Sequence, residues 1–139
     1  MHFNLVDAVL EQTDDRIVTI KQVTAAEEYL QDHFPTFPVL PGVLMIEAMV
    51  QAARKLLSGR SGDTRLVLGG VRALKYGSFV RPGQTLRVEV SLTKSNPDGS
   101  FDLKGEGTVL SHGAVPIERS TTAVSGRFSM RRVMIGAPG

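Results

Sequence analysis

The most apolar stretch of the chain contains one carboxylate and one amide. Glu47 and Gln51 lie between residues 43 and 53, where the other side chains are apolar. They are four positions apart, so a helix would place them on one face. An ionised carboxylate is costly in apolar surroundings, so we expect Glu47 to be buried and its protonated form to be favoured. Such a carboxyl group can act as a general acid. The alternative is a Glu47 that reaches solvent or pairs with an arginine.

A histidine that could accept a proton lies fourteen residues before this carboxylate. His33 is the natural base at neutral pH. It precedes a segment with three prolines, which block helix and sheet pairing and would hold the imidazole in place. The other two histidines are His2, at the terminus, and His112, in a Ser-His-Gly turn. Because the histidines are dispersed and the chain has no cysteine, no metal site is expected.

A glycine at the start of the apolar stretch could bind an anionic oxygen. Gly42 follows Pro41, a typical helix start. The first N–H groups of a helix have no internal partner, and the helix dipole there favours negative charge. Gly42, together with Val43, could therefore donate to a carbonyl oxygen that becomes an enolate. The alternative is an ordinary helix start. No Gly-x-Ser-x-Gly motif supports a serine nucleophile.

Hydrophobic periodicity predicts the elements that position these groups. A helix from about residue 42 to 57 should end at Ser58-Gly59, and Asn96-Pro97-Asp98-Gly99 should form a turn. The predicted strands are 16–24, 66–76, 85–93, 101–110 and 115–133. Residues 25–31 could add one or two helical turns. One long helix and about five strands indicate an α+β domain.

The predicted helix is apolar on almost every face, which predicts burial all round. The simplest solution is an antiparallel sheet curled around it. The length of 139 residues indicates one domain, residues 1–139, and residues 135–139 read as a flexible tail.

Composition excludes several classes of protein. Hydrophobic residues make up 42% and charged residues 22% of the chain, which is the balance of a globular protein. No apolar run is long enough to cross a bilayer, and the absence of cysteine agrees with a cytoplasmic protein. The net charge is +2, and basic residues are concentrated after position 50. This half could attract an acidic partner, but no nucleic-acid motif is present.

The central segment contains a run of fixed positions: His33-Phe34-Pro35, Pro38, Pro41-Gly42-Val43-Leu44, Glu47-Ala48 and Gln51. This pattern resembles the signature of the β-hydroxyacyl-acyl carrier protein dehydratases of the FabZ type. Weaker likenesses are Phe3-Asn4-Leu5-Val6-Asp7 near the start and Lys75-Tyr76, Val80, Pro82-Gly83 and Leu86 later on. Several fixed positions within about twenty residues make the central motif specific.

The resemblance implies a hotdog fold, in which a curled antiparallel sheet wraps around one long central helix. It also implies a homodimer with two shared active sites, and a hexamer as a trimer of dimers. His33 would be the base and Glu47, from the other subunit, the acid. Gly42 and Val43 would bind the thioester carbonyl, and Gln51 would support the carboxylate. No cofactor is implied, because phosphopantetheine arrives with the substrate.

Some positions depart from the family pattern. Asp32 replaces a glycine, Thr36 and Phe37 replace glycine and histidine, and Gly77-Ser78 replace paired arginines. Phe37 would line the pocket mouth, where it contacts substrate. The loss of the arginines weakens the expected docking patch for an acidic carrier protein. These changes affect substrate and carrier more than the chemistry, because His33, Gly42 and Glu47 are retained.

The sequence therefore predicts a hydro-lyase that converts a 3-hydroxyacyl thioester, carried by acyl carrier protein or coenzyme A, into the trans-2-enoyl thioester in acyl-chain synthesis. The acyl tail is expected beside the helix and the strand around Leu66 to Leu74. Two alternatives are a hotdog acyl-thioesterase, which would not need His33, and a non-catalytic subunit that only binds acyl thioesters.

Overall fold

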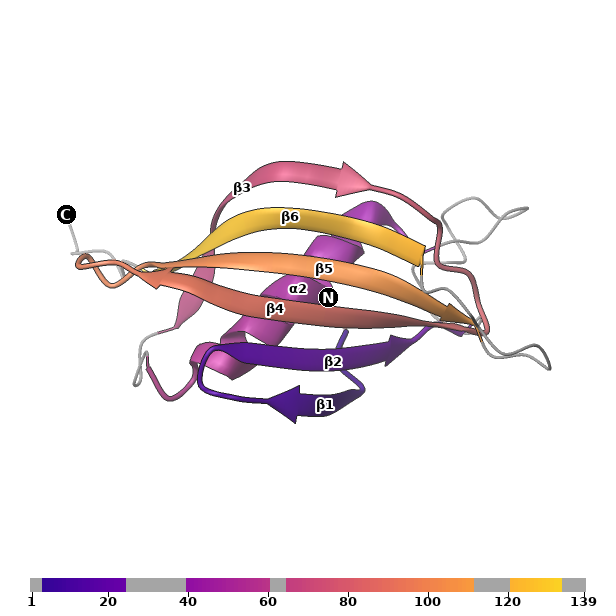
Figure 1. The fold of residues 1–139 in the computed structure, drawn as a ribbon, viewed down its shortest axis with the longest axis horizontal. Coiled ribbons are helices and arrows are strands. Elements are labelled where there is room, and N and C mark those ends of the chain that lie inside the picture. Colours follow the sequence, from indigo (N-terminus) through magenta and orange to yellow (C-terminus); the bar gives the residue numbers. More distant parts are fainter. Residues whose placement is uncertain (1–3, 25–39, 61–64, 112–120, 134–139) are drawn as a thin grey trace.

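A computed structural model describes residues 4–24, 40–60, 65–111 and 121–133. These residues form six strands and one helix (Figure 1). The strands are β1 (Ala8–Gln12), β2 (Arg16–Gln22), β3 (Leu66–Tyr76), β4 (Gln84–Ser95), β5 (Phe101–Ser111) and β6 (Thr121–Arg132), and the helix is α2 (Gly42–Leu57). In the described part of the chain, no helix is long and apolar enough to cross a membrane.

The six strands form one antiparallel sheet in the order β1-β2-β4-β5-β6-β3. Figure 1 shows α2 crossing one face of this sheet diagonally, so that the strands bend over it. Strands β1 and β3 form the two edges, which places the strand that follows α2 at the edge opposite the N-terminal hairpin. The predicted α+β architecture, a curled antiparallel sheet over one long helix, is confirmed.

Helix α2 begins and ends where the sequence predicts, but it is not buried all round. Its buried residues are Met45, Ala48, Met49, Val50, Ala52, Ala53, Leu56 and Leu57. Val43, in the first turn, is 69% exposed. The helix therefore carries more apolar surface than one chain covers. The expectation of burial on every face is wrong for the single chain.

Strands β4 and β5 form the centre of the sheet and show the cleanest alternation. Leu86, Val88 and Val90 are buried, and the residues between them are partly exposed. The two strands are joined by the predicted turn, in which Gly99 has φ of +87°. The Ser100 N–H and hydroxyl both donate to Asp98, which lowers the pKa of that carboxyl group.

A close approach between helix and sheet depends on glycine in β5. A Cβ atom at Gly105 would collide with the side chain of Met49. The absence of a side chain at residue 105 therefore leaves room for Met49 between the helix and the sheet.

The prediction from sequence omits one strand, and the start of another lies outside the described residues. Strand β1 was not predicted, because all five of its residues are exposed and it shows no alternation of apolar and polar side chains. The last strand begins at Thr121 in the described part of the chain, and residues 115–120 of its predicted range lie outside that part. The expected turns at 25–31 and the tail at 135–139 also lie outside the described residues.

Candidate active site

The first turn of α2 has two backbone donors without an acceptor in the described part of the chain. Pro41 caps the helix in an extended conformation and makes no side-chain capping bond. Its carbonyl accepts from the N–H groups of Leu44 and Met45. The N–H groups of Gly42 and Val43 have no acceptor among the described residues. They are the donors the sequence predicted, and the helix dipole adds positive potential at the same place.

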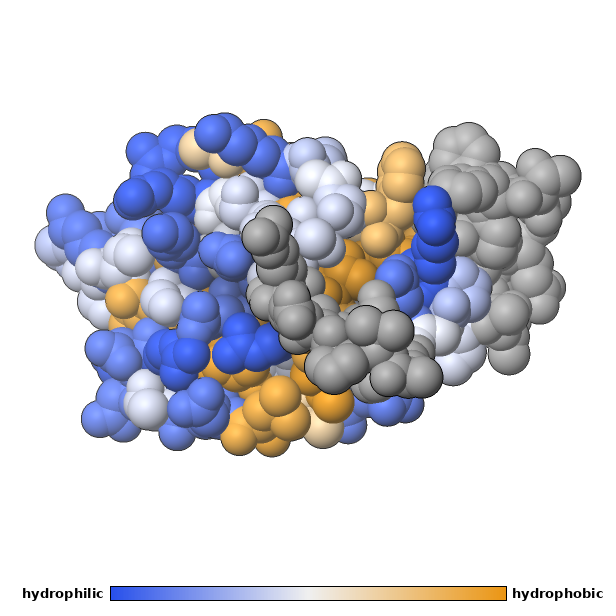
Figure 2. Space-filling model, turned by 45° about the vertical axis from the view of Figure 1, so that its right-hand side comes forward, coloured by the Kyte–Doolittle hydropathy of each residue, from blue (hydrophilic) through white to orange (hydrophobic). Residues whose placement is uncertain are grey.

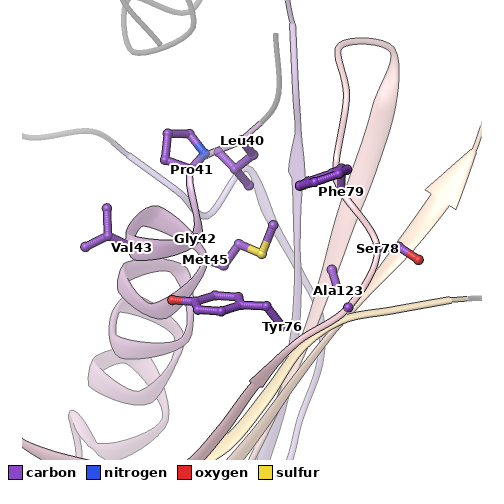
Figure 3. Close-up of a pocket in the computed structure, with 10 residues that line it drawn as sticks. Leu40, Pro41, Gly42, Val43, Met45, Tyr76, Ser78, Phe79 and Ala123 are labelled. Atoms are coloured by element: carbon purple, nitrogen blue, oxygen red, sulfur yellow. The ribbon is translucent and has the colours of Figure 1, made fainter. Parts of the chain in front are cut away.

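These donors lie beside an apolar pocket of about 430 Å³ (Figure 3). Its walls come from the start of α2, the end of β3 and the segment after β3, with one residue from β6. The lining residues are Leu40, Pro41, Gly42, Val43, Met45, Tyr76, Gly77, Ser78, Phe79 and Ala123. The pocket begins where residues 66–74 end, and the acyl tail expected beside that segment stays a prediction.

The ring of Tyr76 forms the wall nearest Gly42. A Cβ atom at Gly42 would lie 2.7 Å from Tyr76 Cε1 and 2.8 Å from Cζ, so the ring occupies the space that a side chain would need. Figure 3 shows the ring lying against the helix start with its hydroxyl end towards α2. Tyr76 is 53% exposed and Phe79 is 59% exposed, so the pocket mouth carries two solvent-accessible rings.

Glu47 is not among the residues that line this pocket. Its side chain is 41% exposed, which contradicts the expectation that the single chain buries it. Gln51 Nε2 donates to Glu47 Oε1 at 3.3 Å, and Arg54 Nη1 lies 3.7 Å from the same oxygen. The alternative raised from the sequence, a carboxylate that reaches solvent and pairs with an arginine, therefore describes its surroundings in one chain. The reason is that Val43 and Glu47, four residues apart, share the uncovered side of α2.

The N-terminal segment supports the carboxylate through the predicted amide. The N–H of Leu5 donates to Gln51 Oε1 at 2.8 Å, while the amide nitrogen of Gln51 faces Glu47. Leu5 is fully buried and fixes the segment before β1 against the helix. Sequence reasoning assigned Gln51 correctly to the carboxylate but missed Arg54, because an arginine late in a helix usually reads as a solvated surface residue.

His33 and Phe37 lie outside the described residues, as do Asp32 and Thr36. Among the described residues, no group of three His, Cys, Asp or Glu side chains could hold a metal ion.

The surface bears further apolar side chains. Val9 and Leu10 in β1 are 42% and 54% exposed. Figure 2 shows apolar atoms at the lower rim of a largely hydrophilic face, at the level of β1 in Figure 1. This area lies on the edge strand remote in the sheet order from β3, so it is separate from the pocket at Tyr76.

A curled antiparallel sheet over one central helix defines a hotdog-fold protein. The structure resembles a solved chain of the dehydratase heterocomplex ApeI:P from Xenorhabdus doucetiae, with a TM-score of 0.65 and 16% identity over 94% of this chain and all of that one. The chain belongs to the ApeI-like dehydratase family, whose model, described as ApeI dehydratase, matches residues 9–114.

Sequence relatives point to the same family. An enzyme named 3-hydroxyacyl-[acyl-carrier-protein] dehydratase FabZ from Pseudothermotoga lettingae is 41% identical over 88 residues, which are 63% of this chain and 63% of that protein. The protein of the same name from Bacillus cytotoxicus is 39% identical over 128 residues, which cover 89% of this chain and 86% of that protein. The resemblance predicted from the central motif is confirmed.

Proposed function

We propose that this protein is a hydro-lyase that dehydrates a 3-hydroxyacyl thioester to the trans-2-enoyl thioester. The observation that carries the proposal is that Gly42 and Val43, whose N–H groups have no acceptor among the described residues, line an apolar pocket. A thioester carbonyl bound there would gain negative charge as the α-proton leaves, and preorganised donors stabilise that charge. The apolar walls suit an acyl chain.

The proposed reaction uses one base and one acid. His33 removes the α-proton, and the electrons of that C–H bond move into the enolate held by Gly42. As the double bond forms, the β-carbon–oxygen bond breaks and Glu47 gives its proton to the departing hydroxyl group, which leaves as water. The enoyl thioester and water together contain the same atoms and electrons as the substrate. The reaction therefore needs no electron acceptor, and we propose no redox cofactor. Phosphopantetheine enters only as part of the substrate.

The geometry of α2 supports a site shared by two subunits. Gly42 and Glu47 are five residues apart, which places them about 140° apart around the helix axis and about 7.5 Å apart along it. Glu47 does not line the pocket beside Gly42 of its own chain. A carboxylate from a second copy would solve this mismatch, and it would cover the exposed side of α2 at Val43 and Glu47. We therefore propose a homodimer as the active form, with a trimer of dimers as its larger assembly.

The proposed carrier is acyl carrier protein, with coenzyme A as the other thioester carrier to be tested. The names of the FabZ relatives support the former. Basic residues after position 50, including Lys75 and Arg81 beside the pocket segment, agree with an acidic partner. The cytoplasm is the compartment we propose for this reaction.

The test is turnover of 3-hydroxyacyl thioesters of short and long chain, each carried on acyl carrier protein and on coenzyme A, with products read by mass. We expect loss of 18 Da from the acyl group, the mass of one water molecule. Glu47→Gln should abolish this product, whereas Glu106→Gln, an exposed acid on β5, should not. Release of the free acid would instead indicate a thioesterase, and binding without either product would indicate a non-catalytic subunit.

A further inference from the structure

Arg54 touches both the proposed acid and the edge strand of the sheet. It lies seven residues after Glu47, almost two full helical turns, so both side chains share one face of α2. Its Nη1 is 3.7 Å from Glu47 Oε1, and its Nε donates to the carbonyl of Leu66 at 3.0 Å. Leu66 is 3% exposed and begins β3. The guanidinium is therefore anchored on rigid backbone at one side and faces the carboxylate with the other.

The contacts to Glu47 are one-sided. Gln51 Nε2 and Arg54 Nη1 both approach Oε1, and Oε2 has no partner among the described residues. Gln51 is itself held by the Leu5 N–H. Two donors tethered to different segments thus converge on one oxygen of the carboxyl group. An oxygen that accepts from the Gln51 amide and faces a guanidinium 3.7 Å away is disfavoured as the site of a proton, because neither group can accept one from it.

We propose that Arg54 is a positioning residue for the acid. It fixes Oε1 as the acceptor, so that the proton to be donated is carried by Oε2 and faces the substrate. When the Oε2–H bond breaks and the proton passes to the departing hydroxyl group, the negative charge left on the carboxylate lies beside the guanidinium. Arg54 touches neither substrate nor reacting atoms in this scheme. The inference rests on the proposed function, because it needs Glu47 to be the proton donor.

Two substitutions of Arg54 separate positioning from ordinary surface pairing. An exposed helix ion pair contributes little, so a merely structural role predicts no kinetic change. We expect Arg54→Gln to lower kcat about tenfold and to leave KM within about twofold, since the lost interaction matters only as charge develops on Glu47. Arg54→Lys should recover part of kcat, because an ammonium keeps the charge but lacks the planar fork that reaches Leu66 and Glu47 together. Lys55→Gln, which removes the neighbouring exposed cation, should leave both constants unchanged.

A second measurement tests whether the effect passes through Glu47. Glu47→Asp shortens the side chain and withdraws the carboxylate from Arg54. If Arg54 acts through this group, Arg54→Gln should cost much less in the Glu47→Asp background than in the wild type. Melting temperatures of all variants identify any loss of fold, and if Arg54→Gln unfolds, Arg54→Lys decides the question alone.

The outcomes separate the positioning role of Arg54 from the proposed dehydratase activity. Full kcat in Arg54→Gln, or a raised KM at unchanged kcat, overturns the positioning role while the hydro-lyase stands. Equal losses in the Glu47→Asp and wild-type backgrounds overturn it as well. If Glu47→Gln keeps full dehydratase turnover, the proposed acid is wrong, and the role of Arg54 falls with it.

Discussion

The space beside Gly42 is filled by the ring of Tyr76, and this contact gives residue 42 two separate roles. Absence of a side chain leaves room for the ring, which lies 2.7 Å from where a Cβ atom would be. The backbone N–H, which has no acceptor among the described residues, is free for a ligand. A single substitution to proline removes both features at once, so the two roles must be tested by a pair of variants.

Gly42→Ala and Gly42→Pro should differ in activity although both fold. Alanine keeps the N–H and displaces the Tyr76 ring, whose far end is exposed and can rotate. Proline is tolerated in the first helical turn but removes the N–H, and loss of one such donor costs roughly 100- to 1000-fold. Measured as kcat, the proline variant should therefore be much slower than the alanine variant. The double variant Gly42→Ala/Tyr76→Ala should regain any kcat that the alanine variant loses through the collision of its methyl group with the Tyr76 ring. Equal rates in the alanine and proline variants would remove the N–H from the mechanism.

Removal of one buried hydroxyl group, that of Thr19, should stabilise the protein. Thr19 is fully buried in β2, and its Oγ1 has no hydrogen-bond partner in the described part of the chain. An unsatisfied buried hydroxyl costs about 1–3 kcal/mol. Thr19→Val keeps the shape of the side chain and removes the polar atom, so the free energy of unfolding should rise by about 1 kcal/mol. Urea denaturation measures this difference in the free energy of unfolding, provided that its dependence on urea concentration is the same for both proteins. A variant less stable than the wild type would mean that the Thr19 hydroxyl group has a hydrogen-bond partner in solution.

Among the elements, the outer face of the sheet carries an unfavourable row of charges. Lys104 in β5 lies directly opposite Arg127 in β6, which lies opposite Arg72 in β3. All three are exposed, and none forms an ion pair within the described residues. Like charges that face each other across strands destabilise a sheet. By contrast, Arg16 in β2 bonds Glu89 and contacts Glu11, which raises the pKa of its guanidinium.

Arg127→Glu should stabilise the sheet by converting two repulsive pairs into attractive ones. We expect a gain of about 1 kcal/mol at low salt, measured by urea unfolding. The gain should shrink in 1 M salt, where the Debye length is about 3 Å. Arg131→Glu is the matched control, because it changes the net charge equally but lies opposite Val67 rather than a cation. If the control variant gains as much free energy of unfolding, the effect comes from the net charge and not from repulsion between Arg127 and its two cationic neighbours.

At the scale of the whole molecule, the exposed side of α2 indicates that one chain is only part of the working protein. The helix carries more apolar surface than its own sheet covers, with Val43 69% exposed. The proposed acid Glu47 is on this uncovered side and does not line the pocket at Gly42. A second subunit would supply both the missing cover and a carboxylate for the pocket.

Complementation between two inactive variants tests this shared site. His33→Ala and Glu47→Gln should each be inactive alone. In a mixed two-fold dimer one site carries both defects, and the other combines the intact His33 with the intact Glu47. Random pairing makes about half the dimers mixed, so co-expression should restore roughly a quarter of wild-type activity. Mass analysis confirms the mixed dimers. A site built within one chain would restore none, since every site would keep one defect.

The sequence by itself determined the elements whose signals are local. The bounds of α2 follow from Pro41-Gly42 and Ser58-Gly59, and the alternation in β4 and the Asn96–Gly99 turn depend only on neighbouring residues. The spacing of Glu47 and Gln51 placed them in contact, because four residues span one helical turn. The same motif was specific enough to indicate the dehydratase family.

Only the tertiary structure decided how much of each residue is covered and which distant residue it meets. Glu47 was expected to be buried because its neighbours in sequence are apolar, yet exposure depends on which side of α2 the sheet covers. The edge strand β1 has no buried face and therefore no periodic signal. Tyr76 against Gly42, and Arg54 between Glu47 and Leu66, join segments whose proximity is set by the path of the chain, which no local pattern encodes.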